Sequence, residues 1–397
     1  MKRKIYKGVA RGKVKAPPSK SYAHRLLICA ALANGESKIS GVSQSVDMQA
    51  TLECIGALGA EFTKTGDSVS VFGGIKESRR VFNCHESGST LRFLLPLALL
   101  TGEECTFIGS ERLMSRGLGV YEEIFEKQGI LFKRDNCSIT LSGRLKPDVF
   151  TVRGDISSQF ISGLLFALPL LNGDSVINLT TQLESRDYVD ITIDAMKRFG
   201  VEIEKGENTY YVRGNQSYIA SNQTVEGDFS NSAFLEAFNI LGGDVSVIGL
   251  NDDSLQGDKI YRKHFRDICN GTPKIDVSDC VDLAPVLMAM ASMKNGAEFI
   301  GTRRLKIKES DRASAMQAEL AKLGVDVEVY ENRVTVGAGV TAPQEALFGH
   351  NDHRIVMALT VILSKVGGEI DGCEAVSKSY PDFFDVISVL GIESETV

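Results

Sequence analysis

The chain has 397 residues, of which 43% are hydrophobic and 24% are charged, which is enough for two buried cores and ordinary for a globular protein. The formal net charge of −7 argues against a general nucleic-acid binder, because such proteins normally carry a basic domain or stripe. The longest apolar runs, 93–100 and 163–171, are well short of the ~20 residues that a membrane-spanning helix needs. Because the net charge is negative, any anionic ligand must be held by local groups of cations.

Eight cysteines occur singly, without a Cys-x-x-Cys pair, which disfavours a zinc ribbon or a redox motif. No apolar signal segment follows the basic residues Met1–Lys4, so the expected compartment is the reducing cytoplasm. His350 and His353 have a spacing that could ligate a metal, but they lack further ligands nearby in sequence. No metal site is predicted.

A helix, a glycine and a short alternating strand recur along the chain. The glycines of the first three copies are Gly59, Gly129 and Gly200, and similar segments surround Gly324 and Gly391. Each glycine fits the position just after a helix, where positive φ is cheap for a residue without Cβ. The spacing of the first three, about 70 residues, predicts duplicated α/β units.

A second, strongly apolar helix is predicted within each unit, beginning at small polar residues. These starts are 18–21, 86–90, 155–159, 228–232, 279–282 and 350–353. Two of them, 154–158 and 227–231, are near copies, which predicts two homologous halves with a boundary near 225–227. If the buried helices run parallel, their N-termini converge at one end of each half and favour anions there. Two such ends facing each other would form an anion-binding cleft between domains.

The first of these starts combines small hydroxyls with two cations. Lys20 and Ser21 can meet an anion at the helix start, and Arg25 lies on the same helix face as Ser21. An ordinary capped helix after Pro17-Pro18 is the alternative.

The second start, Glu86–Arg92, resembles a phosphate loop in composition but lacks the Gly-Lys-Ser/Thr ending of an ATP-binding loop. Gly88 would let a small ligand approach the backbone, and Arg92 and Arg116 could bind a carboxylate or a phosphate. A simple capping loop is the alternative.

Five cations and two carboxylates occur between Arg303 and Arg312, where a strand from Glu298 is expected to give way to a helix starting near Ser310 and ending near Leu323. Glu309 lies among these cations and is available for proton transfer. A solvated, charged helix start is the alternative. Asp282, which could simply cap a helix, and the polar start Asn351–Arg354 add to this second half.

Together, Pro18–Ser21 with Arg25, Lys308–Arg312 and Asn351–Arg354, in this order, resemble the 5-enolpyruvylshikimate-3-phosphate synthase (3-phosphoshikimate 1-carboxyvinyltransferase) family over the whole chain. The resemblance implies transfer of the enolpyruvyl group of phosphoenolpyruvate to the 5-hydroxyl of shikimate 3-phosphate by addition and elimination, with release of phosphate and without a metal or cofactor. This is the sixth step of the shikimate pathway to chorismate and the aromatic amino acids.

The resemblance also implies the fold, an α/β fold with two domains, each an inside-out α/β barrel built from three βαβαββ repeats. The expected domains are a shikimate 3-phosphate-binding lobe, 19–226, and a phosphoenolpyruvate-binding catalytic lobe, 227–397, to which 1–18 return. Closure of the two lobes on the ligands would assemble the site.

The site residues that follow are those matching the family's motifs. Shikimate 3-phosphate would be held by Lys20, Ser21, Arg25, Ser157, Ser158, Gln159, Ser185 and Asp282. Phosphoenolpyruvate would be surrounded by Lys20, Gly88, Arg116, Gln159, Lys308, Arg312, Arg354 and Lys378. Asp282 is the candidate base at the hydroxyl, and Glu309, with Lys20, is the candidate proton route at the methylene carbon. Arg303, Arg304 and Lys306 are expected to be solvated.

One departure from the family is Glu86, where many members have asparagine, and it is left out of the site. Gly88 keeps the family glycine, which predicts inhibition by glyphosate. A rival with the same fold, UDP-N-acetylglucosamine enolpyruvyl transferase, typically has a lysine-asparagine pair, whereas Lys20 precedes Ser21 here. A non-catalytic anion-binding paralogue would not need Asp282, Glu309 and His353. We expect a monomer without nucleic-acid or membrane partners.

Overall fold

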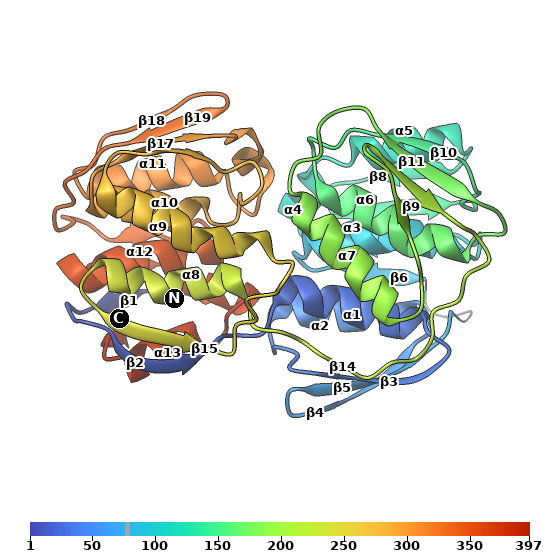
Figure 1. Ribbon diagram of the computed structural model, residues 1–397, viewed down its shortest axis with the longest axis horizontal. Coiled ribbons are helices and arrows are strands. Elements are labelled where there is room, and N and C mark those ends of the chain that lie inside the picture. The colour runs from blue at the N-terminus through green and yellow to red at the C-terminus, as the bar shows by residue number, and fades with distance from the viewer. Residues whose placement is uncertain (76–79) are drawn as a thin grey trace. The chain divides into compact units, whose positions relative to one another are not determined.

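The computed structural model describes residues 1–75 and 80–397 (Figure 1). Its internal contacts divide the chain into two units, which we call the 18–226 unit (Pro18–Glu226) and the 227–397 unit (Met1–Pro17 with Gly227–Val397). Each unit has a hydrophobic core of its own. The chain therefore passes from one unit to the other twice, after Pro17 and after Glu226.

The 18–226 unit contains three four-stranded sheets with one strand order. The sheets are β14(Gln223–Thr224)-β3(Gly35–Ser40)-β5(Ser68–Gly73)-β4(Glu61–Thr65), β6(Val81–Asn83)-β7(Cys105–Ile108)-β9(Ser138–Ser142)-β8(Leu131–Arg134) and β10(Val149–Val152)-β11(Ser175–Leu179)-β13(Thr209–Val212)-β12(Glu204–Lys205). In each sheet the first pair is parallel and the other pairs are antiparallel. A parallel pair needs a crossover, and a buried helix supplies it between β6 and β7 and between β10 and β11. In the first sheet a buried helix instead precedes β3, and its parallel partner β14 comes from the end of the unit.

Those buried helices are α1(Lys20–Leu32), α3(Gly88–Ala98) and α6(Ser158–Ala167). Almost every side chain in them is buried because their sequences are apolar on all faces. The remaining helices of the unit are α2(Val46–Ala57), α4(Glu111–Ser115), α5(Gly119–Lys127), α7(Arg186–Arg198) and the 3-10 turn η1(Leu168–Leu170). The buried helices α1, α3 and α6 lie between the sheets (Figure 1), as expected of an inside-out α/β barrel.

The 227–397 unit has two four-stranded sheets of the same pattern and one strand pair. They are β16(Lys274–Asp276)-β17(Ala297–Ile300)-β19(Arg333–Val336)-β18(Val327–Val329), β20(Leu347–Phe348)-β21(Gly368–Asp371)-β1(Arg3–Ile5)-β22(Ser394–Thr396) and β15(Asp244–Ile248)-β2(Arg11–Lys15). Its helices are α8(Phe229–Ile240), α9(Tyr261–Asn270), α10(Ala284–Met293), α11(Arg312–Lys322), α12(His353–Val366) and α13(Phe383–Val389), with 3-10 turns η2(Gly257–Ile260), η3(Arg303–Ile307) and η4(Cys373–Lys378).

The predicted repeats are visible in these sheets, with two adjustments. The strands β14 and β1 come from segments distant in sequence and fill places in the sheets of other repeats. In the repeat built on β2, α8, β15 and α9, the described residues form only the parallel strand pair and not the two antiparallel strands of the other sheets. The five glycines predicted to follow helices, Gly59, Gly129, Gly200, Gly324 and Gly391, all have positive φ, between 70° and 107°.

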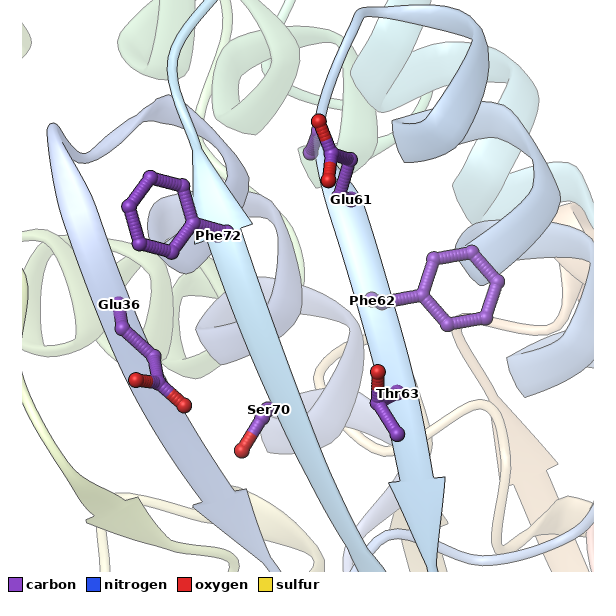
Figure 2. Close-up of a pocket in the computed structure, with 7 residues that line it drawn as sticks. Glu36, Glu61, Phe62, Thr63, Ser70 and Phe72 are labelled. Atoms are coloured by element: carbon purple, nitrogen blue, oxygen red, sulfur yellow. The ribbon is translucent and has the colours of Figure 1, made fainter.

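A surface pocket of about 620 Å³ lies on the sheet of β3, β5 and β4 (Figure 2). Phe72 on β5 stands between Glu36 and Glu61, its partners on the two neighbouring strands. None of the predicted site residues lines this pocket. Among the described helices, none combines the length and the apolarity of a membrane span.

Candidate active site

Arg25 is the most buried predicted cation of the 18–226 unit, with 2% of its surface exposed. Its guanidinium donates to Thr192 Oγ1 (2.7 Å), to the Ser21 carbonyl (2.7 Å) and to the Tyr188 carbonyl (2.9 Å). Burial lowers the pKa of Arg25 to about 10, and no carboxylate of the described residues pairs with it. A buried cation without a carboxylate is costly, so this position favours an anionic ligand.

Lys20 begins α1 after the cap Ser19, and its Nζ lies 2.6 Å from Asp47 Oδ2 on α2. Both side chains are largely buried, at 17% and 11% exposed. Ser21 follows on the first turn of the same helix and is half-buried. Asp47 had not been singled out from the sequence, since an acid in the first turn of a helix is common.

Gln159 joins the starts of α3 and α6. Its Nε2 donates to Ser89 Oγ (2.9 Å) and its Oε1 accepts from Arg92 Nη1 (2.8 Å). Ser157 caps α6 by accepting from the Gln159 backbone N–H at 3.3 Å, and Ser158 is the first residue of the helix. The two predicted polar starts 86–90 and 155–159 therefore meet at one place.

Gly88 is the first residue of α3 and lies against Arg116. A Cβ at Gly88 would be 2.7 Å from Arg116 Nη1, so the absent side chain leaves room for the guanidinium. Ser185 precedes α7 with a left-handed backbone (φ 56°) and is buried.

Arg312 is the centre of the predicted cluster in the 227–397 unit. Its guanidinium is 1% exposed and contacts three carboxylates, Asp352 (2.9 Å), Asp282 (2.7 Å) and Glu309 (2.7 Å). Burial alone would lower the pKa of Arg312, but these carboxylates outweigh it and raise the pKa above its ordinary value. The guanidinium is thus permanently charged and fixed in orientation.

Asp282 shares its carboxylate among three cations. Lys308 Nζ lies 3.2 Å from Oδ1, Arg312 Nη1 lies 2.7 Å from Oδ1, and Arg354 Nη2 lies 3.1 Å from Oδ2. Burial opposes the charge, yet Arg354, Lys308 and Arg312 hold the pKa of Asp282 well below its usual range. The cap position of α10 belongs to Leu283, so Asp282 is not the simple helix cap that the alternative interpretation described.

Lys308 lies between the turn η3 and helix α11, which is capped by Asp311 and begins at Arg312, close to the predicted start near Ser310. Burial lowers the pKa of Lys308 to about 8, although Asp282 works in the opposite direction. Glu309, one position along, is 21% exposed and pairs with Arg312.

The solvated-charge prediction for the neighbouring cations is correct for Arg303 and Lys306, which are exposed, and wrong for Arg304. Arg304 is 5% exposed and donates to the Ser278 carbonyl. The three cations lie in the 3-10 turn η3, in which residues three apart share a face. Arg303 and Lys306 lie on its exposed face, whereas Arg304 and Leu305 lie on its buried face.

Arg354, at the start of α12, makes hydrogen bonds to three groups through its guanidinium. Its Nη1 donates to Ser230 Oγ (2.7 Å) and to the Asp282 carbonyl (3.1 Å), and its Nη2 meets the Asp282 carboxylate. Asp352 caps the helix by accepting from the Arg354 N–H at 2.9 Å. Lys378 Nζ donates to the Asn351 carbonyl at 2.6 Å, which links η4 to the same helix start.

Lys308, Arg312 and Arg354 thus face Asp282, Glu309 and Asp352 in one buried cluster of the 227–397 unit. The roles of Asp352 and Ser230 had not been assigned from the sequence, although both lie in helix starts that it singled out. The cluster can exchange a carboxylate of its own for an incoming anion, and it holds carboxylates that can take part in proton transfer.

Comparison with known proteins gives a consistent picture. A family model described as EPSP synthase (3-phosphoshikimate 1-carboxyvinyltransferase) matches residues 7–387. A protein of Clostridium kluyveri called 3-phosphoshikimate 1-carboxyvinyltransferase is 43% identical over 406 residues, covering 96% of this chain and 95% of its own. A protein of the same name from Clostridioides difficile is 40% identical, covering 98% and 97%.

Two solved structures have a similar fold. EPSP synthase from Acinetobacter baumannii has a TM-score of 0.80 at 20% identity, over all of both chains. The enolpyruvyl transferase NikO from Streptomyces tendae has a TM-score of 0.78 at 15% identity, over 99% of this chain and 98% of its own.

Proposed function

The chain belongs to the EPSP synthase (3-phosphoshikimate 1-carboxyvinyltransferase) family, and from this premise we propose how its residues carry out the reaction. That reaction transfers the enolpyruvyl group of phosphoenolpyruvate to the 5-hydroxyl of shikimate 3-phosphate and releases phosphate. We assign phosphoenolpyruvate to the cations of the 227–397 unit and shikimate 3-phosphate to the polar helix starts of the 18–226 unit. The observation that carries the proposal is the Asp282 carboxylate in contact with three cations.

Phosphoenolpyruvate carries a carboxylate and a phosphate, and these groups suit the cations Lys308, Arg312, Arg354 and Lys378. Arginine forks bind such anions through two parallel hydrogen bonds, and here two arginines approach from different helices. Lys20, Gly88, Arg116 and Gln159 complete the proposed surroundings of the donor. Gly88 contributes by the space that it leaves for Arg116.

Asp282 is the proposed base, and its environment suggests how substrate would activate it. In the free protein the three cations hold its pKa too low for effective proton removal at neutral pH. An anion that takes over Lys308, Arg312 and Arg354 leaves Asp282 with less positive charge nearby, so the pKa of Asp282 rises. Binding of the donor would then prepare the base for the acceptor hydroxyl.

The addition step forms a bond between the acceptor oxygen and C2 of phosphoenolpyruvate. Asp282 takes the hydroxyl proton while Glu309, with Lys20, supplies one to the methylene carbon. The elimination step then breaks the bond from C2 to the phosphate oxygen, and the methyl group returns a proton as the double bond re-forms. Glu309 is suited to this work because it is partly exposed, unlike Asp352.

Shikimate 3-phosphate is proposed to lie against Lys20, Ser21, Arg25, Ser157, Ser158, Gln159 and Ser185, with Asp282 at its reacting hydroxyl. The buried guanidinium of Arg25, which pairs with no carboxylate of residues 1–75 and 80–397, suits a phosphate. Serine hydroxyls and helix N-termini supply neutral donors for the remaining oxygens.

We also propose the cytoplasm as the compartment and a monomer as the working form. The first is supported by eight cysteines that are all free, as expected in a reducing compartment. Size-exclusion chromatography with light scattering would test the second, and a dimer would contradict it.

The test of the function is phosphate release from phosphoenolpyruvate in the presence of shikimate 3-phosphate. We expect turnover with this acceptor and none with UDP-N-acetylglucosamine, the acceptor of the related transferase. Asp282→Asn serves as the negative control, since it keeps the shape of the side chain and removes the base. Absence of phosphate release by the unmodified protein would overturn the proposal.

A further inference from the structure

Glu319, on helix α11, is a buried acid that the proposed reaction does not use, and it is 1% exposed. Its Oε2 accepts from the Phe348 N–H at 2.9 Å, and its Oε1 lies 2.8 Å from His350 Nε2. Lys322 Nζ, one turn along the helix, lies 3.1 Å from Oε2. A buried carboxylate is costly unless its oxygens are paired, so these three donors fix the position of Glu319.

The carboxylate of Glu319 is charged in the folded protein. Burial raises its pKa, but the hydrogen bonds from the His350 ring, the Phe348 N–H and Lys322 outweigh burial and lower the pKa below its ordinary value. An ionised carboxylate only accepts hydrogen bonds, so His350 Nε2 carries a proton and donates to it. Glu319 thus holds both a backbone group and a ring of the segment 348–351.

The segment 348–351 has an unfavourable backbone. His350 (φ 49°) and Asn351 (φ 52°) are both left-handed, and two successive residues with side chains seldom adopt this conformation. Such residues persist only where surrounding contacts hold them. Glu319 supplies such a hold, because its two hydrogen bonds reach the segment on either side of Gly349.

The last residue of this segment contacts a proposed ligand of phosphoenolpyruvate. Lys378 Nζ donates to the Asn351 carbonyl at 2.6 Å, so the left-handed backbone at Asn351 sets where the ammonium group lies. The helix start that follows is held independently, because Asp352 pairs with Arg312 at 2.9 Å. Glu319 and Arg312 are seven residues apart on α11 and therefore lie on the same face, about two turns from each other. One face of α11 thus holds the segment and the start of α12 by separate contacts.

We propose that Glu319 is a positioning residue, which fixes the segment 348–351 and thereby holds Lys378 in place through the Asn351 carbonyl, without touching the substrate. The inference rests on the proposed role of Lys378 as a ligand of phosphoenolpyruvate. Without the carboxylate, the left-handed segment relaxes and the carbonyl that holds the ammonium group moves. Binding of phosphoenolpyruvate then weakens, whereas the proposed ligands of shikimate 3-phosphate stay in place.

The test compares Glu319→Gln with the wild type in steady-state kinetics. The amide keeps the size of the side chain but loses the charge and one acceptor oxygen. We expect the KM for phosphoenolpyruvate to rise about tenfold, as for the loss of one charge-assisted hydrogen bond, while kcat and the KM for shikimate 3-phosphate stay within about twofold. Glu345→Gln is the matched control and should have no effect, because Glu345 is an exposed acid 3.8 Å from the same Lys322.

Two further variants separate positioning from a purely structural effect. In a Lys378→Ala background, Glu319→Gln should raise the KM for phosphoenolpyruvate no further, because the group that it positions is already absent. His350→Asn removes the ring that meets Glu319 and introduces a residue type that tolerates the left-handed backbone. It should also raise the KM for phosphoenolpyruvate, and it carries the test if Glu319→Gln does not fold.

An unchanged KM for phosphoenolpyruvate in a folded Glu319→Gln protein would overturn the inference. An equal increase in the Lys378→Ala background would also overturn it, as would an unchanged KM in His350→Asn. In each case the wild type still releases phosphate, so the proposed function stands. A wild type without turnover would instead remove the function itself.

Discussion

Gly88 shows how the absence of a side chain shapes the proposed donor site. Gly88→Ala adds a methyl group 2.7 Å from Arg116 Nη1, and the flexible arginine has to move. We expect the KM for phosphoenolpyruvate to rise about 10-fold to 100-fold, the range for misplacing a binding group. The melting temperature should not fall, since alanine favours a helix more than glycine does. An unchanged KM would exclude Gly88 and Arg116 from the donor site, and sensitivity to glyphosate can be measured on the same pair of proteins.

Lys308 provides a prediction about pH. Its pKa of about 8 means that the free enzyme loses this cation as the pH rises above 8. We expect kcat/KM for phosphoenolpyruvate to fall above pH 8, because kcat/KM reports the ionisations of the free enzyme. Lys308→Arg keeps its charge, so its basic limb should lie at higher pH even if its maximum is lower. Identical basic limbs in the two proteins would remove Lys308 from donor binding.

The two proposed proton carriers can be tested separately. Asp282→Ala and Glu309→Ala should each lose about 100-fold to 10,000-fold in kcat, the usual range for a general acid or base. Glu298→Ala provides a control at an acid on the strand β17, outside the cluster. Turnover close to the wild type in either variant would take that residue out of its proposed role.

At the scale of elements, Asp352 joins two helices, because it caps α12 and pairs with Arg312 on α11. Asp352→Ala leaves a buried guanidinium with one carboxylate fewer, and we expect a loss of about 3–5 kcal/mol in the free energy of unfolding. The pKa of Asp352 is lowered in the folded state, since Arg312 outweighs burial. The stability that it contributes is therefore present above its unfolded pKa of 3.8 and is lost as the pH falls below it. Urea unfolding at pH 7 and at pH 3.5 should show a smaller difference between wild type and variant at the lower pH.

The elements also show what sequence reasoning could reach. The positions of the buried helices followed from their polar starts and apolar bodies, because both signals are local. The places of β14 and β1 did not follow, because each pairs with strands far away in sequence. Arg304 was mispredicted for a related reason, since the 3-10 turn that buries it has little signature of its own.

The same limit applies to the candidate site. Its cations could be named from short motifs, but the acid that each one meets depends on tertiary contacts. Asp47, the partner of Lys20, lies 27 positions away in the chain, and Ser230 lies 124 positions from Arg354.

At the scale of the whole molecule, the two units differ in continuity, because one is a single segment of the chain and the other is made of two segments. The 18–226 unit is continuous and has its own core, so we expect a fragment of these residues to unfold cooperatively in urea. A fragment of residues 227–397 lacks β1 and β2, which would leave β22 and β15 without a partner strand and β21 with β20 alone. It should not give a cooperative transition. A cooperative transition by the second fragment, or none by the first, would contradict this difference.

The pairing of β1 with β22 has a consequence for the order of events during synthesis. The strand β1 cannot complete its pairing until β22 has been made, since Arg3 pairs with Thr396 and the Val397 N–H donates to the Lys2 carbonyl at 3.1 Å. During synthesis, residues 18–226 can fold as soon as they emerge from the ribosome, but the sheet that contains β1 is complete only after β22 has been made. Deletion of the last few residues would therefore act on the beginning of the protein as much as on its end.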